Sequence, residues 1–584
     1  KISKASITAR KEMLKDYLSP GELGEDFENI IESVKSGVPT AVFGLTEAAK
    51  CHLASVTDEP ILYIAKDSLY AAGVVNEIEA LSGEKVVYLP AKDDVLLYKT
   101  AFDRTSLFSR LSALYKIKNG ARIVVTTFPA LLQLFPKNLP VYEVKKGGCY
   151  DLAEVAAKLI EFGYKREEFA EEKGTFAVRG DILEVFPVNG EDSFRADFFG
   201  DEAESVFRYE DGDKEKKSFV NGFEIIPATD ALVLNDEIPE IKEKLKAALA
   251  SFGTLAVKDD ARKIVNDLNE KLDAGAPCNE FQYIMPLLST VTDDIFTYIP
   301  KNAVVIFDEC KMLYDSLTSS LKEHAERVLA LARTGKAFRF TAAQYADSEK
   351  LVKRLTSGKK AAFQNITAAI NFFSPLKTFN LRCSPIARYT ANFEDIYRDI
   401  KNWRFGGYKV LVCAGNAERA NALSDELYSR GISSVRAEDT DLKGGVAVIT
   451  AYYLPTGVIY HNAKLALIGT GDAYIGKPKE KRIKRKRGDL FSAPEVGDYA
   501  VHEVHGVGYV KGVKRISTQE GTKDYVAVEY LGGDTLYVGV DQIDKLTKYM
   551  GGGEKPKLNR IGGKEFERIK ERVKASIATM TINL

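Results

Sequence analysis

The feature that most constrains this chain is the stretch Val496–Tyr549, in which short β-branched runs alternate with turn signals. The runs cover residues 499–501, 508–516, 524–530 and 535–540, and the turn signals are His505-Gly506, Gln519-Glu520-Gly521 and Gly532-Gly533-Asp534. Such spacing is typical of antiparallel strands joined by tight turns. It predicts a small β-barrel. Because the stretch holds no acid–base pair or phosphate loop, we expect a docking surface, with an exposed strand edge open to strand addition.

Two histidines in this stretch, His502 and His505, have the spacing of a possible metal site. No cysteine or third histidine lies near them in the sequence, and they fall where a strand meets a turn. Packing or turn hydrogen bonding is therefore the favoured interpretation. We expect neither a metal site nor a catalytic residue in this chain.

Composition sets the broad class of protein. A length of 584 residues predicts several domains, on the order of four at the usual domain size. The 82 basic and 83 acidic residues nearly cancel, so bulk charge indicates no polyanionic partner. The six cysteines show no paired spacing, which is typical of reduced thiols. With no apolar run long enough to span a membrane, a cytoplasmic protein without a membrane partner is expected.

A degenerate phosphate loop is predicted near the amino end. The apolar run Thr40–Phe43 reads as a buried strand and leads through Gly44 into a helical pattern, which is the context of a nucleotide-binding loop. Lys50 survives from that motif, but Ala49 stands where a glycine would approach a phosphate and Cys51 where a hydroxyl would bind magnesium. A loop retained for its fold is preferred over an ATP site.

A second partial motif agrees with this interpretation. Val304–Glu309 is an apolar strand that ends in Asp308 and Glu309, the form of a segment that holds magnesium in nucleotide hydrolases. Without a working phosphate loop, these acids have no nucleotide to act on. We expect no cofactor in this chain.

The segment between these motifs carries a specific resemblance. Asp151–Ile226 contains GTFAVRGDILEVFPVNG and SFRADFFGDEAESVFRYE, which alternate as strands of an exposed sheet do. It resembles the domain that the excision-repair protein UvrB and the transcription-repair coupling factors use to bind UvrA. The resemblance implies that Arg179, Arg195 and Phe199 face UvrA. The alternatives are that Arg179 stabilises a turn and that Phe199 packs in the core.

The barrel stretch carries a second resemblance. VGDYAVHEVHGVG, DYVAVEYLGGDTLYV and VDQIDKLTKY are similar to the RNA-polymerase-interacting domain of transcription-repair coupling factors and CarD-type regulators. This implies a contact with the polymerase β subunit near Lys511–Thr518, made by Ile516 together with Lys514 and Arg515. The alternative is that Ile516 points into the barrel core.

The expected fold class is a multidomain α/β chain. It has a degenerate helicase-like domain with an inserted UvrA-binding domain, a second small α/β domain and a carboxyl-terminal β-barrel of CarD or Tudor type. The expected segments are 1–140 and 227–345 for the first domain, 141–226 for the insert, 380–475 for the second α/β domain, 476–493 for a basic linker, 494–549 for the barrel and 560–584 for the start of a linker helix.

These resemblances together imply transcription-coupled DNA repair, with recognition of stalled RNA polymerase and recruitment of UvrA. The chain looks like the amino-terminal portion of a longer, ATP-dependent DNA translocase, whose absent motor would bind ATP, magnesium and most of the DNA. Hydrolysis by this chain itself is not expected. The basic run 477–487 is a linker or a contact with DNA. The alternative functions are a UvrB-like repair ATPase and a CarD-like transcription regulator.

Overall fold

The computed structural model describes residues 18–559 except 19, 93–103, 253–254, 276, 388, 390–392, 437–446, 473–496, 503–505, 519–520, 533, 540–545 and 549–557. The chain forms two compact units, Lys1–Ile475 and Gly476–Leu584. No helix in the described ranges is both long and apolar enough to cross a bilayer. The predicted basic linker, the predicted helix at 564–577 and His505 lie outside the described residues.

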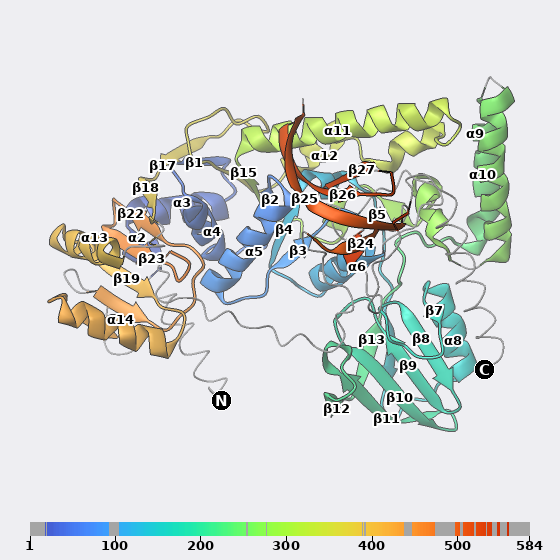
Figure 1. The fold of residues 1–584 in the computed structure, drawn as a ribbon, viewed down its shortest axis with the longest axis horizontal. Coiled ribbons are helices and arrows are strands. Elements are labelled where there is room, and N and C mark those ends of the chain that lie inside the picture. The colour runs from blue at the N-terminus through green and yellow to red at the C-terminus, as the bar shows by residue number, and fades with distance from the viewer. Residues whose placement is uncertain are drawn as a thin grey trace. The chain divides into compact units, whose positions relative to one another are not determined.

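The first unit contains a seven-stranded, all-parallel sheet with the order β17-β1-β16-β15-β2-β4-β3 (Figure 1). Its strands are β1 (Thr40–Phe43), β2 (Ile61–Ala65), β3 (Val87–Leu89), β4 (Ile123–Thr127), β15 (Val304–Asp308), β16 (Lys360–Phe363) and β17 (Lys377–Asn380). The predicted strands at both nucleotide-like motifs are confirmed. The sheet also takes in β16 and β17, so it continues past residue 345 to Asn380.

This sheet is buried on both faces. Strands β2, β4 and β15 are buried at every position and mostly apolar, without the alternation of a half-exposed strand. Leu62 and Ile64 belong to the core on one face, and Tyr63 belongs to the core on the other. The covering helices are α3 (Glu25–Lys35), α4 (Glu47–Ser55), α5 (Ser68–Ser82), α6 (Thr105–Lys118), α7 (Phe128–Leu132), α11 (Cys310–Arg333) and α12 (Ser348–Leu355).

The insert forms a separate six-stranded sheet with the order β12-β11-β10-β9-β8-β7. Its strands are β7 (Lys165–Arg166), β8 (Thr175–Arg179), β9 (Ile182–Phe186), β10 (Ser193–Phe199), β11 (Glu202–Tyr209) and β12 (Lys217–Phe219). Helix α8 (Leu152–Glu161) packs beside β7 and β8 (Figure 1). The chain enters and leaves through the antiparallel pair β6 (Tyr142–Lys145) and β13 (Gly222–Ile225).

A small helical cluster follows the insert. It consists of α9 (Ile238–Ala250), α10 (Leu255–Ala274) and the 3₁₀ segment η3 (Asn279–Leu287). Leu245, Leu268 and Phe338 are among the residues of its core.

The last part of the first unit is a mixed sheet with the order β18-β22-β23-β19-β21-β20. Its elements are β18 (Cys383–Pro385), α13 (Phe393–Phe405), β19 (Lys409–Cys413), α14 (Ala417–Ser429), β20 (Ser434–Arg436), β21 (Ala447–Thr450), β22 (Val458–Tyr460) and β23 (Leu465–Ile468). Leu411, Val448 and Leu467 belong to the same buried cluster as Tyr63 of the first sheet. The two sheets therefore share one continuous core, which the sequence did not indicate.

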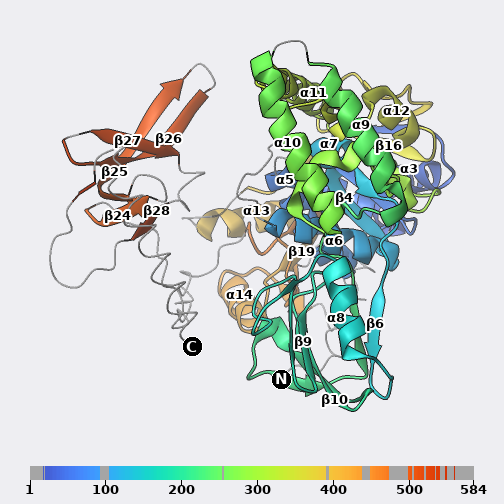
Figure 2. The ribbon, with the colours of Figure 1, turned by 90° about the vertical axis from the view of Figure 1, so that its right-hand side faces the viewer.

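The second unit is a five-stranded antiparallel sheet with the order β27-β26-β25-β24-β28. Its strands are β24 (Tyr499–His502), β25 (Gly506–Thr518), β26 (Gly521–Glu529), β27 (Thr535–Gly539) and β28 (Leu546–Lys548). Figure 2 shows these strands side by side. Val510, Val528 and Tyr530 are among its core residues. The predicted β module is confirmed, while its closure into a barrel stays a prediction.

Candidate functional site

The phosphate-loop-like segment joins β1 to α4, as the sequence predicted, but its first two amides, those of Gly44 and Leu45, are already bonded within the protein. The Gly44 N–H donates to the carbonyl of Asn365, and the Leu45 N–H donates to the carbonyl of Gln364, both at 3.1 Å. Backbone N–H groups of such a loop are the groups that would hold a phosphate. Here they bind the chain segment that follows β16.

A second segment closes the other side of this loop. The Leu381 N–H donates to the Phe43 carbonyl at 2.9 Å, and the Cys383 N–H donates to the Gly44 carbonyl at 3.3 Å. Gly44 has φ +76°, and a Cβ on it would lie 2.0 Å from the Leu381 carbonyl oxygen. Glycine is therefore required here by the close approach of the protein's own backbone.

The lysine of the loop is neutralised internally. Lys50 Nζ lies 2.6 Å from Asp308 Oδ1 and 2.5 Å from Glu309 Oε1. The hydroxyl of Tyr63 donates to Asp308 Oδ2 at 2.6 Å, and the Asn365 N–H donates to Glu309 Oε1 at 2.8 Å. The lysine of the first partial motif therefore forms ion pairs with both acids of the second. We call Gly44, Leu45, Lys50, Asp308 and Glu309 the closed loop site.

Burial makes this ion pair strong. Lys50 is 2% exposed, and Asp308 is fully buried. Burial alone would lower the pKa of Lys50, but the charges and hydrogen bonds of Asp308 and Glu309 outweigh it and raise that pKa. Cys51, on the next residue of α4, is also buried, and burial raises the pKa of its thiol well above the ordinary value. Neither side chain is available for binding or nucleophilic chemistry in this arrangement.

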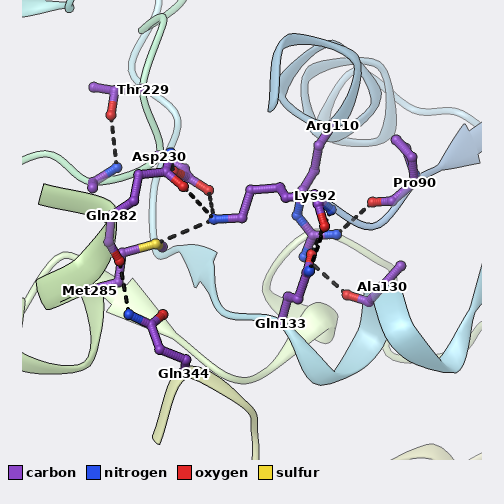
Figure 3. Close-up of polar contacts among 11 residues, drawn as sticks. Pro90, Lys92, Arg110, Ala130, Gln133, Thr229, Asp230, Gln282, Met285 and Gln344 are labelled. Atoms are coloured by element: carbon purple, nitrogen blue, oxygen red, sulfur yellow. Dashed lines mark hydrogen bonds and ion pairs between the residues drawn. The ribbon is translucent and has the colours of Figure 1, made fainter. Parts of the chain in front are cut away.

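A second buried cation, Lys92, joins the segment that follows the insert to the segment that follows β3 (Figure 3). Lys92 Nζ lies 2.5 Å from Asp230 Oδ2 and 3.2 Å from Gln282 Oε1, and Gln282 Nε2 donates to Asp230 Oδ1 at 2.6 Å. The Lys92 backbone exchanges hydrogen bonds with the amide of Gln133. Arg110, which burial gives a pKa lowered to about 10, donates to the carbonyls of Pro90 and Ala130. These contacts join segments that are far apart in the sequence, and no local sequence motif predicted them.

The insert carries a half-exposed face of charged and aromatic side chains. Along β10, Arg195, Asp197 and Phe199 alternate with buried Ala196 and Phe198, so the first three share one face of the sheet. Arg195 lies opposite Glu184 of β9 in the strand register. We call Arg179, Glu184, Arg195, Asp197 and Phe199 the arginine face.

The arginines of the arginine face are partly open to solvent. Arg179 Nη2 lies 2.8 Å from Glu184 Oε2, and the two side chains are 35% and 11% exposed. Arg195 Nε lies 2.6 Å from Asp197 Oδ1, and the two side chains are 28% and 31% exposed. Hydrogen bonding to Asp197 raises the pKa of Arg195, so the guanidinium stays charged at any physiological pH. Exposed pairs of this kind are weak and can exchange partners.

The structure excludes the alternative given for Phe199, packing in the core, and supports the alternative given for Arg179, a hydrogen bond to a nearby carbonyl. Phe199 is 82% exposed, so core packing is excluded for it. Arg179 does donate to a nearby carbonyl, that of Glu168 at 3.2 Å, and its guanidinium also lies 4.1 Å from the centre of the Phe169 ring. Phe169 is 43% exposed and was missed in the sequence. Its stacking under Arg179 extends the face with a second aromatic ring.

In the second unit, the outer part of β25 is paired on one side. Strand β24 pairs with residues 506–509 of β25, whereas β26 pairs along 509–518. Within the described residues, the other side of β25 beyond Tyr509 carries no strand. Lys511 and Lys514 are exposed, and Val513 is 59% exposed. This part of β25 extends beyond the packed core.

The three predicted polymerase-contact residues lie in that outer part. Lys514 Nζ lies 3.4 Å from the Tyr537 hydroxyl. Arg515 and Ile516 pair through their backbones with Asp524 and Lys523, and their side chains lie outside the described residues. Whether Ile516 faces a partner or the core therefore stays a prediction. His502 is buried at 8% exposure, and no cluster of metal-binding side chains occurs in the described part of the chain.

Comparison with known proteins adds two family matches to this geometry. The family described as "UvrB interaction domain" matches residues 142–230, which include the whole arginine face. The family described as "CarD-like/TRCF RID domain" matches residues 495–550, the β module of the second unit. The transcription-repair-coupling factor of Bacillus subtilis (strain 168) is 24% identical over 587 residues, which cover 96% of this chain and 49% of that protein.

This chain is similar to transcription-repair-coupling factors along nearly its whole length. The transcription-repair-coupling factor of Staphylococcus aureus (strain USA300) is also 24% identical, over 92% of this chain and 47% of that protein. The chain thus spans about half the length of the curated relatives it matches. A solved structure titled "XPD_Helicase" aligns with 75% of this chain and 80% of its own at 6% identity and a TM-score of 0.19, too low to carry an argument about the fold.

Proposed function

We propose that this chain is the docking part of a transcription-repair-coupling factor. It holds UvrA through the arginine face of the insert and the RNA polymerase β subunit through the outer part of β25. The observation that carries this proposal is the presence of both family matches, residues 142–230 and 495–550, in one chain. A UvrB-like enzyme would account for the first match alone, and a CarD-like regulator for the second alone.

The arginine face suits a protein partner. Its guanidinium groups are partly exposed. The pair of Arg195 with Asp197 is exposed on both sides, so a partner can take over either member at small cost. Phe199, at 82% exposure, supplies apolar area that a partner can bury. Arginine and aromatic side chains of this kind dominate the binding energy of many interfaces.

The outer part of β25 suits strand addition. Its unpaired side offers backbone donors and acceptors, and exposed Lys511, Val513 and Lys514 flank them. We infer that the module closes into a barrel and that the outer part of β25 forms the contact. Ile516 would provide the apolar anchor.

The closed loop site serves the fold rather than a nucleotide. Its amides and its lysine are satisfied by the protein's own carbonyls and carboxylates, which supports a degenerate loop without ATP or magnesium. In this proposal, ATP-driven movement along DNA belongs to the remaining half of the full-length protein. The chain would work in the cytoplasm, where polymerase displaced from a lesion leaves DNA to the repair proteins.

Two pull-downs test the proposal, one with purified UvrA and one with the polymerase β subunit. The wild-type chain is expected to retain both. Phe199→Ala should reduce the retention of UvrA alone. Ile516→Arg should lose the β subunit alone, because a charge is not readily buried at an interface. If a folded wild-type chain retains neither partner, the proposal is wrong. If Ile516→Arg unfolds the second unit, Ile516 is a core residue, and Lys514→Glu then tests the β25 contact.

A further inference from the structure

A deep cleft in the first unit has no part in the proposed docking. It has a volume of about 1050 Å³ and lies between helices α4 and α5 and the segment 452–456. Tyr70, Tyr452 and Tyr453 supply aromatic walls. Two lining side chains are largely exposed although apolar in character, Leu69 at 85% and Tyr453 at 58%. The cleft is therefore large enough for a ligand with an extended apolar part.

The charges around this cleft are mostly acidic. Glu47, Asp67, Glu77 and Glu79 line it, against a single lining cation, Lys66. The Lys66 ammonium lies 4.5 Å from the centre of the Tyr70 ring. An ammonium group already lies against an aromatic wall within the acidic cleft, which illustrates the kind of group the surroundings stabilise.

Glu77 is the unusual member of this set. It is only 5% exposed, and its Oε1 accepts no hydrogen bond from the described residues. A buried carboxyl oxygen without a donor costs free energy, and among the described residues no salt bridge to Glu77 offsets that cost. Burial raises the pKa of Glu77 to about 8, although hydrogen bonds from the side chain and backbone of Thr456 act to lower it. Asp472 and Glu47 add to the negative charge around it, and the thiols of Cys51 and Cys413 also lie within its electrostatic reach.

We propose that this cleft binds a guanidinium or ammonium group carried on an aliphatic chain. The cation would pair with Glu77 at the base of the cleft, between the tyrosine rings, and the aliphatic chain would lie on Leu69 and Tyr453. A carboxylate combined with aromatic faces is the surrounding such cations prefer. The source is either a free polyamine or an arginine or lysine side chain of a partner protein.

Calorimetric titration of the whole chain at low ionic strength tests this proposal with two probes, spermidine and N-acetyl-arginine amide. The wild type should bind at least one of them saturably, and the probe that binds identifies the source. Glu77→Gln keeps the shape of the side chain but removes its charge, so binding should weaken at least tenfold. Glu28→Gln, at an exposed position of α3, is the matched control and should bind both probes as the wild type does.

The pH dependence separates binding at Glu77 from a general loss of structure. Binding requires the ionised carboxylate, so the wild-type affinity should rise between pH 7 and pH 9, and this rise should be absent in Glu77→Gln. If Glu77→Gln does not fold, Tyr453→Ala replaces it, since this exposed wall residue should still reduce affinity several-fold. Absence of saturable binding by both probes, or equal binding by wild type and the folded Glu77 variant, overturns the proposal.

Discussion

The closed loop site and the arginine face use the same chemistry with opposite results. Both pair a cation with neighbouring carboxylates at 2.5–2.8 Å. In the closed loop site the lysine is 2% exposed, and every hydrogen-bonding group described above has an internal partner. On the arginine face the arginines are 35% and 28% exposed. Exposure, rather than the type of charged pair, separates a pair that stabilises the fold from one that can meet a partner.

The comparison also shows what holds together the loop that has the sequence context of a nucleotide site. Strand, glycine and helix are retained because the segments 364–365 and 380–383 pack against them. The acids that would hold magnesium hold Lys50 instead. The former site therefore contributes to stability, and its residues are constrained by packing.

The largest expected effect is on stability at the closed loop site. Lys50→Met leaves Asp308 buried without its cation, so it should lower the free energy of unfolding by ~3–5 kcal/mol. Lys35→Met, which breaks the exposed pair between Lys35 and Asp58, should cost ~0–1 kcal/mol. Urea denaturation of the two variants measures the difference. Equal, small losses would show that the buried pair does not hold this region together.

The next largest effect is a pH dependence of the stability, caused by the buried His52. His52 of α4 lies 2.7 Å from the Tyr460 hydroxyl and 2.9 Å from the Leu18 carbonyl, and burial lowers its pKa from 6.5 to about 4. Between these values the unfolded chain binds a proton that the folded chain does not, so stability should fall as the pH drops from 6.5 to 4, by ~3 kcal/mol at most.

Thermal melting of wild type and His52→Gln across this range measures that contribution. The variant should show a shallower loss of melting temperature with falling pH. Arg195→Ala, on the arginine face, should leave the steep wild-type dependence in place, because Arg195 does not titrate there. Parallel curves for wild type and His52→Gln would rule out a buried neutral histidine at this position.

A smaller effect is expected for single changes on the arginine face. Arg179→Ala, Arg195→Ala and Phe199→Ala should each weaken UvrA binding by ~1–2 kcal/mol. Melting temperatures should hardly change, least of all for Phe199→Ala, since that side chain is 82% exposed. The matched control is Arg208→Ala. Arg208 on β11 is paired with Phe194 on β10, so its side chain lies on the face of the sheet opposite to Arg195. Its removal should leave the affinity for UvrA unchanged.

The smallest expected effect comes from restoring the motif letters of the loop. Ala49→Gly combined with Cys51→Thr should not create ATP binding, because the Gly44 and Leu45 amides stay bonded to the carbonyls of residues 364 and 365. Titration with a fluorescent ATP analogue measures this directly. Micromolar affinity in the double variant would mean that the two covering segments move aside readily.

The sequence predicted those parts of the molecule that depend on neighbouring residues. The strand at 304–308, the helix α11 and the alternation of β8 to β11 follow from apolar period and turn chemistry, and they were found. Strand β16 has only four residues and no alternation, and it was left unassigned. Pattern alone does not specify strands that short.

The parts that could not be predicted depend on contacts between distant segments. The hydrogen bonds from Gly44 to Asn365 and from Lys92 to Asp230 join residues far apart in the chain. Glu77 lies in helix α5, and the segment 452–456 lines the same cleft. The resemblance to UvrA-binding domains singled out Arg195 and Phe199, whereas the position of Phe169 against Arg179 depends on the fold.

Calorimetric titration of UvrA into this chain tests the central claim most directly, with wild type, the triple variant Arg179→Ala/Arg195→Ala/Phe199→Ala and Arg208→Ala measured in parallel. Our account predicts saturable binding by the wild type and by Arg208→Ala. It predicts at least a hundredfold weaker binding by the triple variant, with its melting temperature within a few degrees of wild type. A folded triple variant that binds UvrA with wild-type affinity would contradict the account and place the contact on another surface.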